Sequence, residues 1–200
     1  MNAIAKQLDT EAMRQWFEHM HRHPELSMQE QRTAEFIAET LRSFGGYEVE
    51  TGIGKHGIVA TLSAGSGDKT IGLRADFDAL PIQEQNNFAY TSTVDGVSHL
   101  CGHDGHTAML LGAAKYLTDT RNFNGTVRLI FQPGEETMEG GPAMIREGLF
   151  ERFPVDAVFG MHNIPGLEEG KFYFHPGEMM SAVDNWEVEI VGKGGHGGIP

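Results

Sequence analysis

The stretch Thr126-Val-Arg-Leu-Ile-Phe-Gln-Pro-Gly-Glu-Glu136 indicates the fold most directly. Its first six residues are mostly β-branched or apolar, which predicts a strand, and Pro133-Gly134 predicts the turn that ends it. Similar runs lie at residues 47–51, 57–62, 70–74 and 155–160, and helices are expected at 105–117 and 141–149. Strands alternating with helices predict an α/β fold, a mixed and mostly parallel sheet flanked by helices, with its ligand-bearing loops at one edge.

The first 45 residues predict two helices. Apolar residues recur at three- and four-residue spacing from Thr10 to Met20, and His23-Pro24 ends this pattern. Ser27-Met-Gln-Glu30 matches a capping box, in which the two outer side chains satisfy free amide groups at a helix start. An apolar stripe follows, and Gly45-Gly46 is expected to end the second helix.

The composition is that of a globular protein with one substantial core. The chain has 200 residues, 40% of them hydrophobic, and a formal net charge of −13 with only 15 Lys and Arg. This charge argues against nucleic-acid or anionic-membrane partners and favours a small-molecule ligand. We expect neither a signal peptide nor a membrane span. The single cysteine cannot form an internal disulfide, which fits a cytoplasmic location.

A second domain is predicted to begin near residue 180. Apolar and acidic residues alternate over 185–191, as in a half-exposed strand, and a glycine-rich loop follows at 192–198. We therefore expect a metal-binding domain over 1–180 and the start of another over 181–200. Because the chain stops directly after the glycine-rich loop, we expect it to be part of a longer polypeptide.

The segment from His99 to His106 carries the densest chemistry. Cys101 and His103 are two residues apart, so in an extended segment both side chains share one face and can chelate metal. Thiolate, imidazole and carboxylate together favour zinc, with manganese, cobalt or nickel as alternatives. We expect His99 and His106 to support these ligands or the fold. The alternatives are a buried thiol beside a helix-capping imidazole, and a redox or nucleophilic thiol, which lacks a resolving cysteine.

Carboxylates and a further histidine follow other predicted strands. Neighbouring side chains of Glu135-Glu136 diverge, so one carboxylate can bind metal while the other acts as a general base. Alone, such a pair is more typical of an acidic helix start. His162 closes the strand at 155–160 and is expected to be a ligand rather than an ordinary loop residue. Asp76 is expected to orient an imidazole, and Asp78 and Arg74 to be structural.

Four segments together resemble one enzyme family. They are Arg74-Ala-Asp-Phe-Asp-Ala-Leu-Pro81, Cys101-Gly-His-Asp-Gly-His-Thr107, Phe131-Gln-Pro-Gly-Glu-Glu136 and Gly160-Met-His162. This set is similar to the signatures of the two-metal amidohydrolases, which include hippurate hydrolases, aminoacylases and plant auxin-conjugate hydrolases. His23-Pro-Glu-Leu26 and the segment 192–200 also resemble that family. The resemblance spans nearly the whole chain, with the motifs in the family's order.

The resemblance implies a zinc-exopeptidase-like catalytic domain interrupted by a small α/β lid domain that often mediates dimerisation. By position, Glu135 would be the general base, and His196 would reach an active site, commonly the partner subunit's, to stabilise the tetrahedral intermediate. Members of the family continue for roughly as long again and supply one more histidine ligand. The metal ligands carried over by position are Cys101, His103, Glu136 and His162.

The expected function is hydrolysis of N-acyl amino acids to a carboxylic acid and a free amino acid by a homodimer or higher oligomer. Two divalent transition-metal ions would activate the attacking water and the scissile carbonyl. A dipeptidase or carboxypeptidase with the same site is the nearest alternative. A non-catalytic metal- or small-molecule-binding protein is another, but it would not need the spare carboxylate of Glu135-Glu136.

Overall fold

A five-stranded mixed sheet is the centre of the computed structural model, which describes residues 8–184 and 186–198. The strand order is β1-β2-β4-β3-β5. In chain order the strands are β1 (Glu48–Ile53), β2 (Gly57–Ala64), β3 (Thr70–Asp76), β4 (Gly125–Gln132) and β5 (Ala157–Gly160). The chain divides into two units after Asn163, and each is described by itself.

The pairing of the strands brings three loops to one edge of the sheet. β1, β2 and β4 pair antiparallel, whereas β3 is parallel to both β4 and β5. Asp76 pairs with Gln132, and Arg74 pairs with Gly160, so β3, β4 and β5 end side by side. The predicted mixed sheet is therefore confirmed, and so is the gathering of its loops at one edge. The sheet is not mostly parallel, because two of its four strand pairings are antiparallel.

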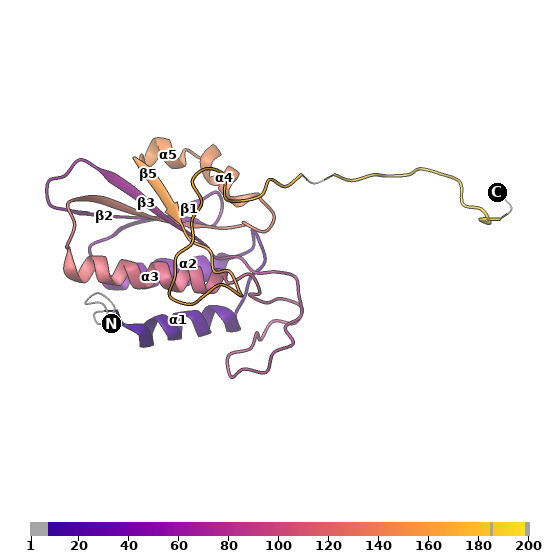
Figure 1. Cartoon of the computed structure of the whole chain (residues 1–200), viewed down its shortest axis with the longest axis horizontal. Coiled ribbons are helices and arrows are strands. Elements are labelled where there is room, and N and C mark those ends of the chain that lie inside the picture. Colours follow the sequence, from indigo (N-terminus) through magenta and orange to yellow (C-terminus); the bar gives the residue numbers. More distant parts are fainter. Residues whose placement is uncertain (1–7, 185, 199–200) are drawn as a thin grey trace. The chain divides into compact units, whose positions relative to one another are not determined.

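Helices cover both faces of the sheet (Figure 1). One face carries α1 (Thr10–Arg22), α2 (Gln31–Phe44) and α3 (His103–Thr120); the other carries α4 (Gly140–Arg146) and α5 (Leu149–Arg152). Alternation along β4 supplies both cores, because successive strand residues face opposite sides. Leu129 and Phe131 pack in the core that contains α2 and α3, and Ile130 packs with Met144 of α4.

Two helices differ from the sequence prediction. α3 begins at His103 rather than at Gly105, because the turn into the helix is made at Gly102, whose φ is 92°. The prediction that Cys101 and His103 chelate metal assumed an extended segment. The structure shows that this segment is not extended. The helix expected over 141–149 is divided into α4 and α5, because Gly148 takes a φ of 83° that a continuous helix does not allow.

The predicted capping box is wrong. α2 begins at Gln31, and its Thr33 amide donates to the Glu25 carboxylate, 2.8 Å away. The Ser27 hydroxyl instead donates to Asp78, and the Glu30 carboxylate accepts from the amides of Met28 and Gly134. Both side chains thus bind loops near the ends of β3 and β4 rather than the start of their own helix.

In the second unit, residues 164–184 and 186–198 form neither a helix nor a strand, and their side chains are exposed. The strand predicted over 185–191 is not confirmed for residues 186–191, which have no neighbouring strand within that part of the chain to take up their backbone hydrogen bonds. Asn185, the first residue of that prediction, lies outside the described residues. The domain boundary at 180/181 stays a prediction. Among the described helices, none is long and apolar enough to cross a membrane.

Candidate metal centre

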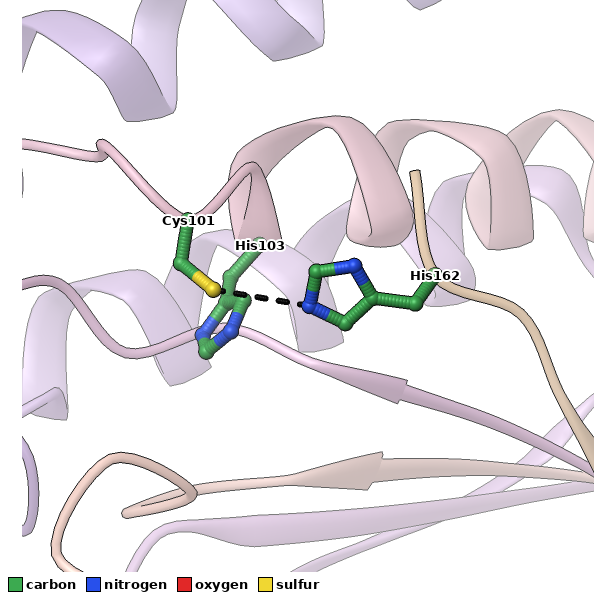
Figure 2. Close-up of side chains that lie close together, drawn as sticks. All are labelled: Cys101, His103 and His162. Atoms are coloured by element: carbon green, nitrogen blue, oxygen red, sulfur yellow. Dashed lines mark hydrogen bonds between the residues drawn. The ribbon is translucent and has the colours of Figure 1, made fainter. Parts of the chain in front are cut away.

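The first cluster of potential ligands contains Cys101, His103 and His162 (Figure 2). One ligand atom from each lies within 4.8 Å of the others. The Cys101 Sγ is 3.4 Å from the His162 Nε2, and the His162 Nδ1 donates to the carbonyl of Asn163 at 2.7 Å. That backbone bond fixes the ring so that its Nε2 faces the thiol, as Figure 2 shows.

A second cluster shares His103 and adds Glu135 and Glu136 from the turn after β4. The His103 Nε2 lies 3.8 Å from the nearer oxygen of each carboxylate. Among the described residues, this nitrogen and the Glu136 Oε1 are buried with no hydrogen-bond partner. Buried polar atoms almost always have partners, so two orphaned atoms facing each other indicate a shared ligand. A thiol, imidazoles and carboxylates fit a divalent transition metal there.

Asp78 connects the two clusters. Its Oδ1 is 3.0 Å from the His103 Nδ1, and its Oδ2 accepts from the Ser27 hydroxyl at 2.6 Å and the Glu136 amide at 3.0 Å. Asp78 therefore holds the His103 ring with its Nε2 toward Glu136 and also holds the backbone of Glu136. From the sequence, Asp78 is predicted to be structural only, whereas these bonds place it at the site. Its position two residues after Asp76, on the same side of the strand end, was the signal for a role at the site.

Asp76 holds the other buried imidazole. It is 2.6 Å from the His106 Nδ1 and 2.7 Å from the Arg74 guanidinium. Burial opposes ionisation of Asp76, but the hydrogen bond from His106 and the charge of Arg74 outweigh it and lower the pKa to about 2. The His106 Nε2 is 2.5 Å from the Asn163 Oδ1, so both ring nitrogens of His106 have partners. This geometry agrees with a supporting role for Asp76 and His106.

The electrostatics of the site distinguish its acids. Burial, together with the negative charge of Asp76, raises the pKa of Glu135. Burial, and then the charge of Glu136, raises the pKa of the Cys101 thiol to about 12. Without a bound metal ion, the thiol therefore stays protonated at neutral pH. This argues against a free nucleophilic or redox thiolate. A bound divalent cation reverses this tendency and deprotonates a coordinating thiol.

Two further histidines from the sequence prediction, His99 and His196, are in no group of potential ligands among the described residues. His99 is buried, neither ring nitrogen has a partner among the described residues, and burial lowers its pKa to about 4. It is therefore a neutral side chain in the interior. His196 belongs to the second unit and is exposed, and its role stays a prediction.

Three residues that contribute to this region were not predicted from the sequence: Asn163, Ser27 and Glu30. Asn163 directly follows His162, so its proximity could have been noticed. Ser27 and Glu30 bind partners 51 and 104 residues away. No local pattern predicts contacts over such separations, because they depend on the way α2 packs against the sheet.

Comparison with known proteins gives this arrangement a family. The profile of peptidase family M20/M25/M40 matches residues 72–197. The chain is 50% identical to a hippurate hydrolase of Campylobacter jejuni over 100% of this chain and 52% of the relative. It is 46% identical to an N-acyl-L-amino acid amidohydrolase of Geobacillus stearothermophilus over 92% of this chain and 50% of that relative. The chain thus spans about half the length of the curated relatives it matches.

A solved structure agrees with the profile. It is a Bacillus subtilis protein described as a dinuclear metal binding peptidase from the M20 family, with a TM-score of 0.74 and 41% identity. The superposition covers 78% of this chain and 44% of that one. The resemblance to two-metal amidohydrolases is thereby confirmed, and the chain belongs to peptidase family M20/M25/M40.

Proposed function

We propose that this chain carries the metal centre of an amidohydrolase that cleaves N-acyl amino acids of the hippurate type. The observation that carries the proposal is the pair of orphaned buried atoms, the His103 Nε2 and the Glu136 Oε1, beside a second carboxylate on Glu135. A site that only bound metal would not need the additional acid. The two amidohydrolase relatives support an amide substrate over other bonds.

In the proposed reaction, two divalent metal ions would be held by Cys101, His103, Glu136 and His162. When bound, the metal ions supply Lewis-acid activation of the water and of the scissile carbonyl. Asp78 keeps the Nε2 of His103 directed toward Glu136 through its bond to the Nδ1. The bond from the His162 Nδ1 to the Asn163 carbonyl does the same for the Nε2 of His162.

Glu135 is the proposed general base. It removes a proton from the attacking water and later delivers it to the nitrogen of the leaving amino acid. Its side chain is 40% exposed, so it can exchange protons with substrate, and its raised pKa lies closer to neutral pH, where proton transfer is efficient. His196 is proposed to donate a hydrogen bond to the oxygen of the tetrahedral intermediate, a contact of the kind worth about 3 kcal/mol.

Metal stoichiometry tests the proposal first. Protein purified without chelator is incubated with Zn²⁺ or Mn²⁺, desalted and measured by plasma mass spectrometry. We expect close to two ions per chain for the wild type and a clear loss for His103→Ala. His175→Ala, which removes an exposed histidine of the second unit, is the matched control and should retain the wild-type value. A wild type that is folded but holds no metal contradicts the proposal.

Substrate preference tests the proposed specificity for N-acyl amino acids. The alternative is a dipeptidase or carboxypeptidase, favoured by the description of the Bacillus subtilis structure as a peptidase. Hydrolysis of benzoyl-glycine and of an unblocked dipeptide is compared under the same metal loading. A higher kcat/KM for benzoyl-glycine supports the amidohydrolase, and the reverse order supports the peptidase. We also propose that the enzyme forms a homodimer or higher oligomer and is located in the cytoplasm.

A further inference from the structure

Glu30 is an unusual residue for the start of a surface helix. It directly precedes α2, yet it is fully buried. Its Oε2 has no hydrogen-bond partner in the part of the chain that the structure describes. Burying a carboxylate is costly unless its contacts compensate for the lost hydration. The residue therefore needs an explanation that helix capping does not provide.

The Oε1 of Glu30 binds two backbone amides, one of which belongs to a residue in an uncommon backbone conformation. It accepts from the Met28 amide at 2.8 Å and from the Gly134 amide at 2.7 Å. Met28 has a φ of 61° and Gly134 a φ of 54°, both in the left-handed region. Glycine adopts this region readily, whereas a non-glycine residue such as Met28 keeps it when surrounding contacts hold it. One oxygen of Glu30 thus joins the segment before α2 to the turn after β4.

The turn after β4 is held at two points. The Gly134 carbonyl accepts from the amides of Glu139 and Gly140, which closes the turn on itself. Its attachments to other elements include the Gly134 amide bound by Glu30 and the Glu136 amide bound by Asp78. These two bonds flank Glu135. Fixing the backbone on both sides of Glu135 restricts where its carboxylate can lie.

We propose that Glu30 is a positioning residue whose buried oxygen, through the Gly134 amide, fixes the turn that presents Glu135 and Glu136 to the metal centre. This inference rests on the proposed function for the chemistry of those two carboxylates. Their placement matters because supporting contacts around metal ligands typically change affinity or activity by about 10- to 100-fold. The Met28 side chain packs closely against the same turn, since a β-carbon at Gly134 would lie only 2.6 Å from its sulfur.

Three variants separate this role from simple stability. Glu30→Ala removes the acceptor, whereas Glu30→Gln keeps a carbonyl oxygen able to accept from both amides. Thr33→Val is the matched control. Thr33 lies in the first turn of α2, which directly follows Glu30. The variant removes the hydrogen bond from the buried Thr33 hydroxyl to Glu25 and leaves the bond between Glu30 and the Gly134 amide intact. It should lower the Tm without affecting the turn.

The measurements are the dissociation constant for Zn²⁺, by chelator competition, and hydrogen exchange of the Gly134 amide. We expect Glu30→Ala to raise the dissociation constant about 10- to 100-fold and to accelerate exchange at Gly134. Glu30→Gln should stay close to the wild type in both, and Thr33→Val should match the wild type in Zn²⁺ affinity. At saturating Zn²⁺, Glu30→Ala should lower kcat on benzoyl-glycine more than it changes KM.

The proposal is overturned if Glu30→Ala keeps the wild-type Zn²⁺ affinity and the wild-type exchange rate at Gly134. It is also overturned if Glu30→Gln weakens Zn²⁺ binding and accelerates exchange as much as Glu30→Ala does. If Glu30→Ala does not fold, Glu30→Asp replaces it: the shorter side chain keeps the charge but withdraws the oxygen, and unchanged exchange at Gly134 then overturns the proposal. Exchange needs neither metal nor substrate, so it tests Glu30 even if the wild type binds no Zn²⁺, which would count against the proposed function alone.

Discussion

The end of β3 and the turn after β4 each present two carboxylates, and the two pairs differ in exposure and in contacts. The side chains of Asp76 and Asp78 are 1% and 0% exposed, and imidazoles and other donors bind them. Those of Glu135 and Glu136 are 40% and 23% exposed. Identical chemistry at neighbouring strand ends is thus divided between a buried pair and an accessible pair.

The pKa shifts follow this division. Burial opposes ionisation of Asp76 and Asp78, but the hydrogen bonds from His106 and His103 outweigh it, so the pKa of each aspartate is lowered. Burial and the charge of Asp76 raise the pKa of Glu135 instead. A permanently ionised carboxylate holds an imidazole, whereas one with a raised pKa can exchange a proton. This division fits the proposed roles, in which Asp76 and Asp78 orient the site and Glu135 is the proposed general base.

Glu135→Gln tests the accessible pair and has the largest expected effect. Removing a general base typically lowers kcat by about 100- to 10,000-fold, and we expect a loss in that range on benzoyl-glycine. Metal content and Tm should be unchanged, because the Glu135 side chain makes no hydrogen bond to the other residues that the structure describes, and its backbone bond with Met138 does not depend on the side chain. Glu139→Gln, an exposed position in the same turn, is the control. Loss of metal from Glu135→Gln would show that Glu135 and Glu136 have each other's roles.

Asp78→Ala tests the buried pair. It removes the acceptor for the His103 ring, the Ser27 hydroxyl and the Glu136 amide at once. Breaking a buried ionic contact typically costs about 3 kcal/mol or more, so the free energy of unfolding should fall by that order, measured by denaturant titration. Zn²⁺ affinity should also fall, by about 10- to 100-fold. Asp95→Ala, on the surface, should change neither quantity. If Asp78→Ala is equally mild, the buried carboxylates do not hold the site in place.

The accessible pair was the easier one to find from sequence. Glu135-Glu136 directly follows Pro133-Gly134 at a predicted strand end, and the strand, the turn and the sheet edge all appear where they were expected. Local composition suffices there because a strand and its turn involve neighbouring residues. The mixed sheet could be predicted for the same reason.

The buried pair shows where this reasoning stops. Asp78 appeared structural because its partners, Ser27, His103 and Glu136, come from three other segments. Ser27 and Glu30 even matched a capping box, since local spacing was right, but α2 begins later and their side chains bind loops brought near by packing. Local patterns cannot choose between a nearby amide and a distant one of equal hydrogen-bonding strength.

Gly102→Ala extends the comparison to the loop that carries Cys101 and His103. Gly102 has a φ of 92°, and a β-carbon there would lie 2.4 Å from the Asn163 Oδ1, which is bonded to His106. Residues forced into this region of backbone conformation cost about 1–3 kcal/mol. We expect a loss of that order in the free energy of unfolding, together with weaker Zn²⁺ binding. Unchanged Zn²⁺ binding would show that this loop, unlike the end of β3 and the turn after β4, can be displaced without harm to the site.

Gly105→Ala, three residues further on, should have the smallest effect and the opposite sign. Gly105 lies in the first turn of α3, and a β-carbon there would meet no atom within 4 Å. Alanine restricts the unfolded chain more than glycine and favours the helix, so stability should rise by about 0.5–1 kcal/mol. Zn²⁺ affinity should not change, because the bonds of Asp78 and Asp76 already hold His103 and His106. A loss of affinity in Gly105→Ala would mean that α3 itself, rather than those buried aspartates, sets the positions of the two imidazoles.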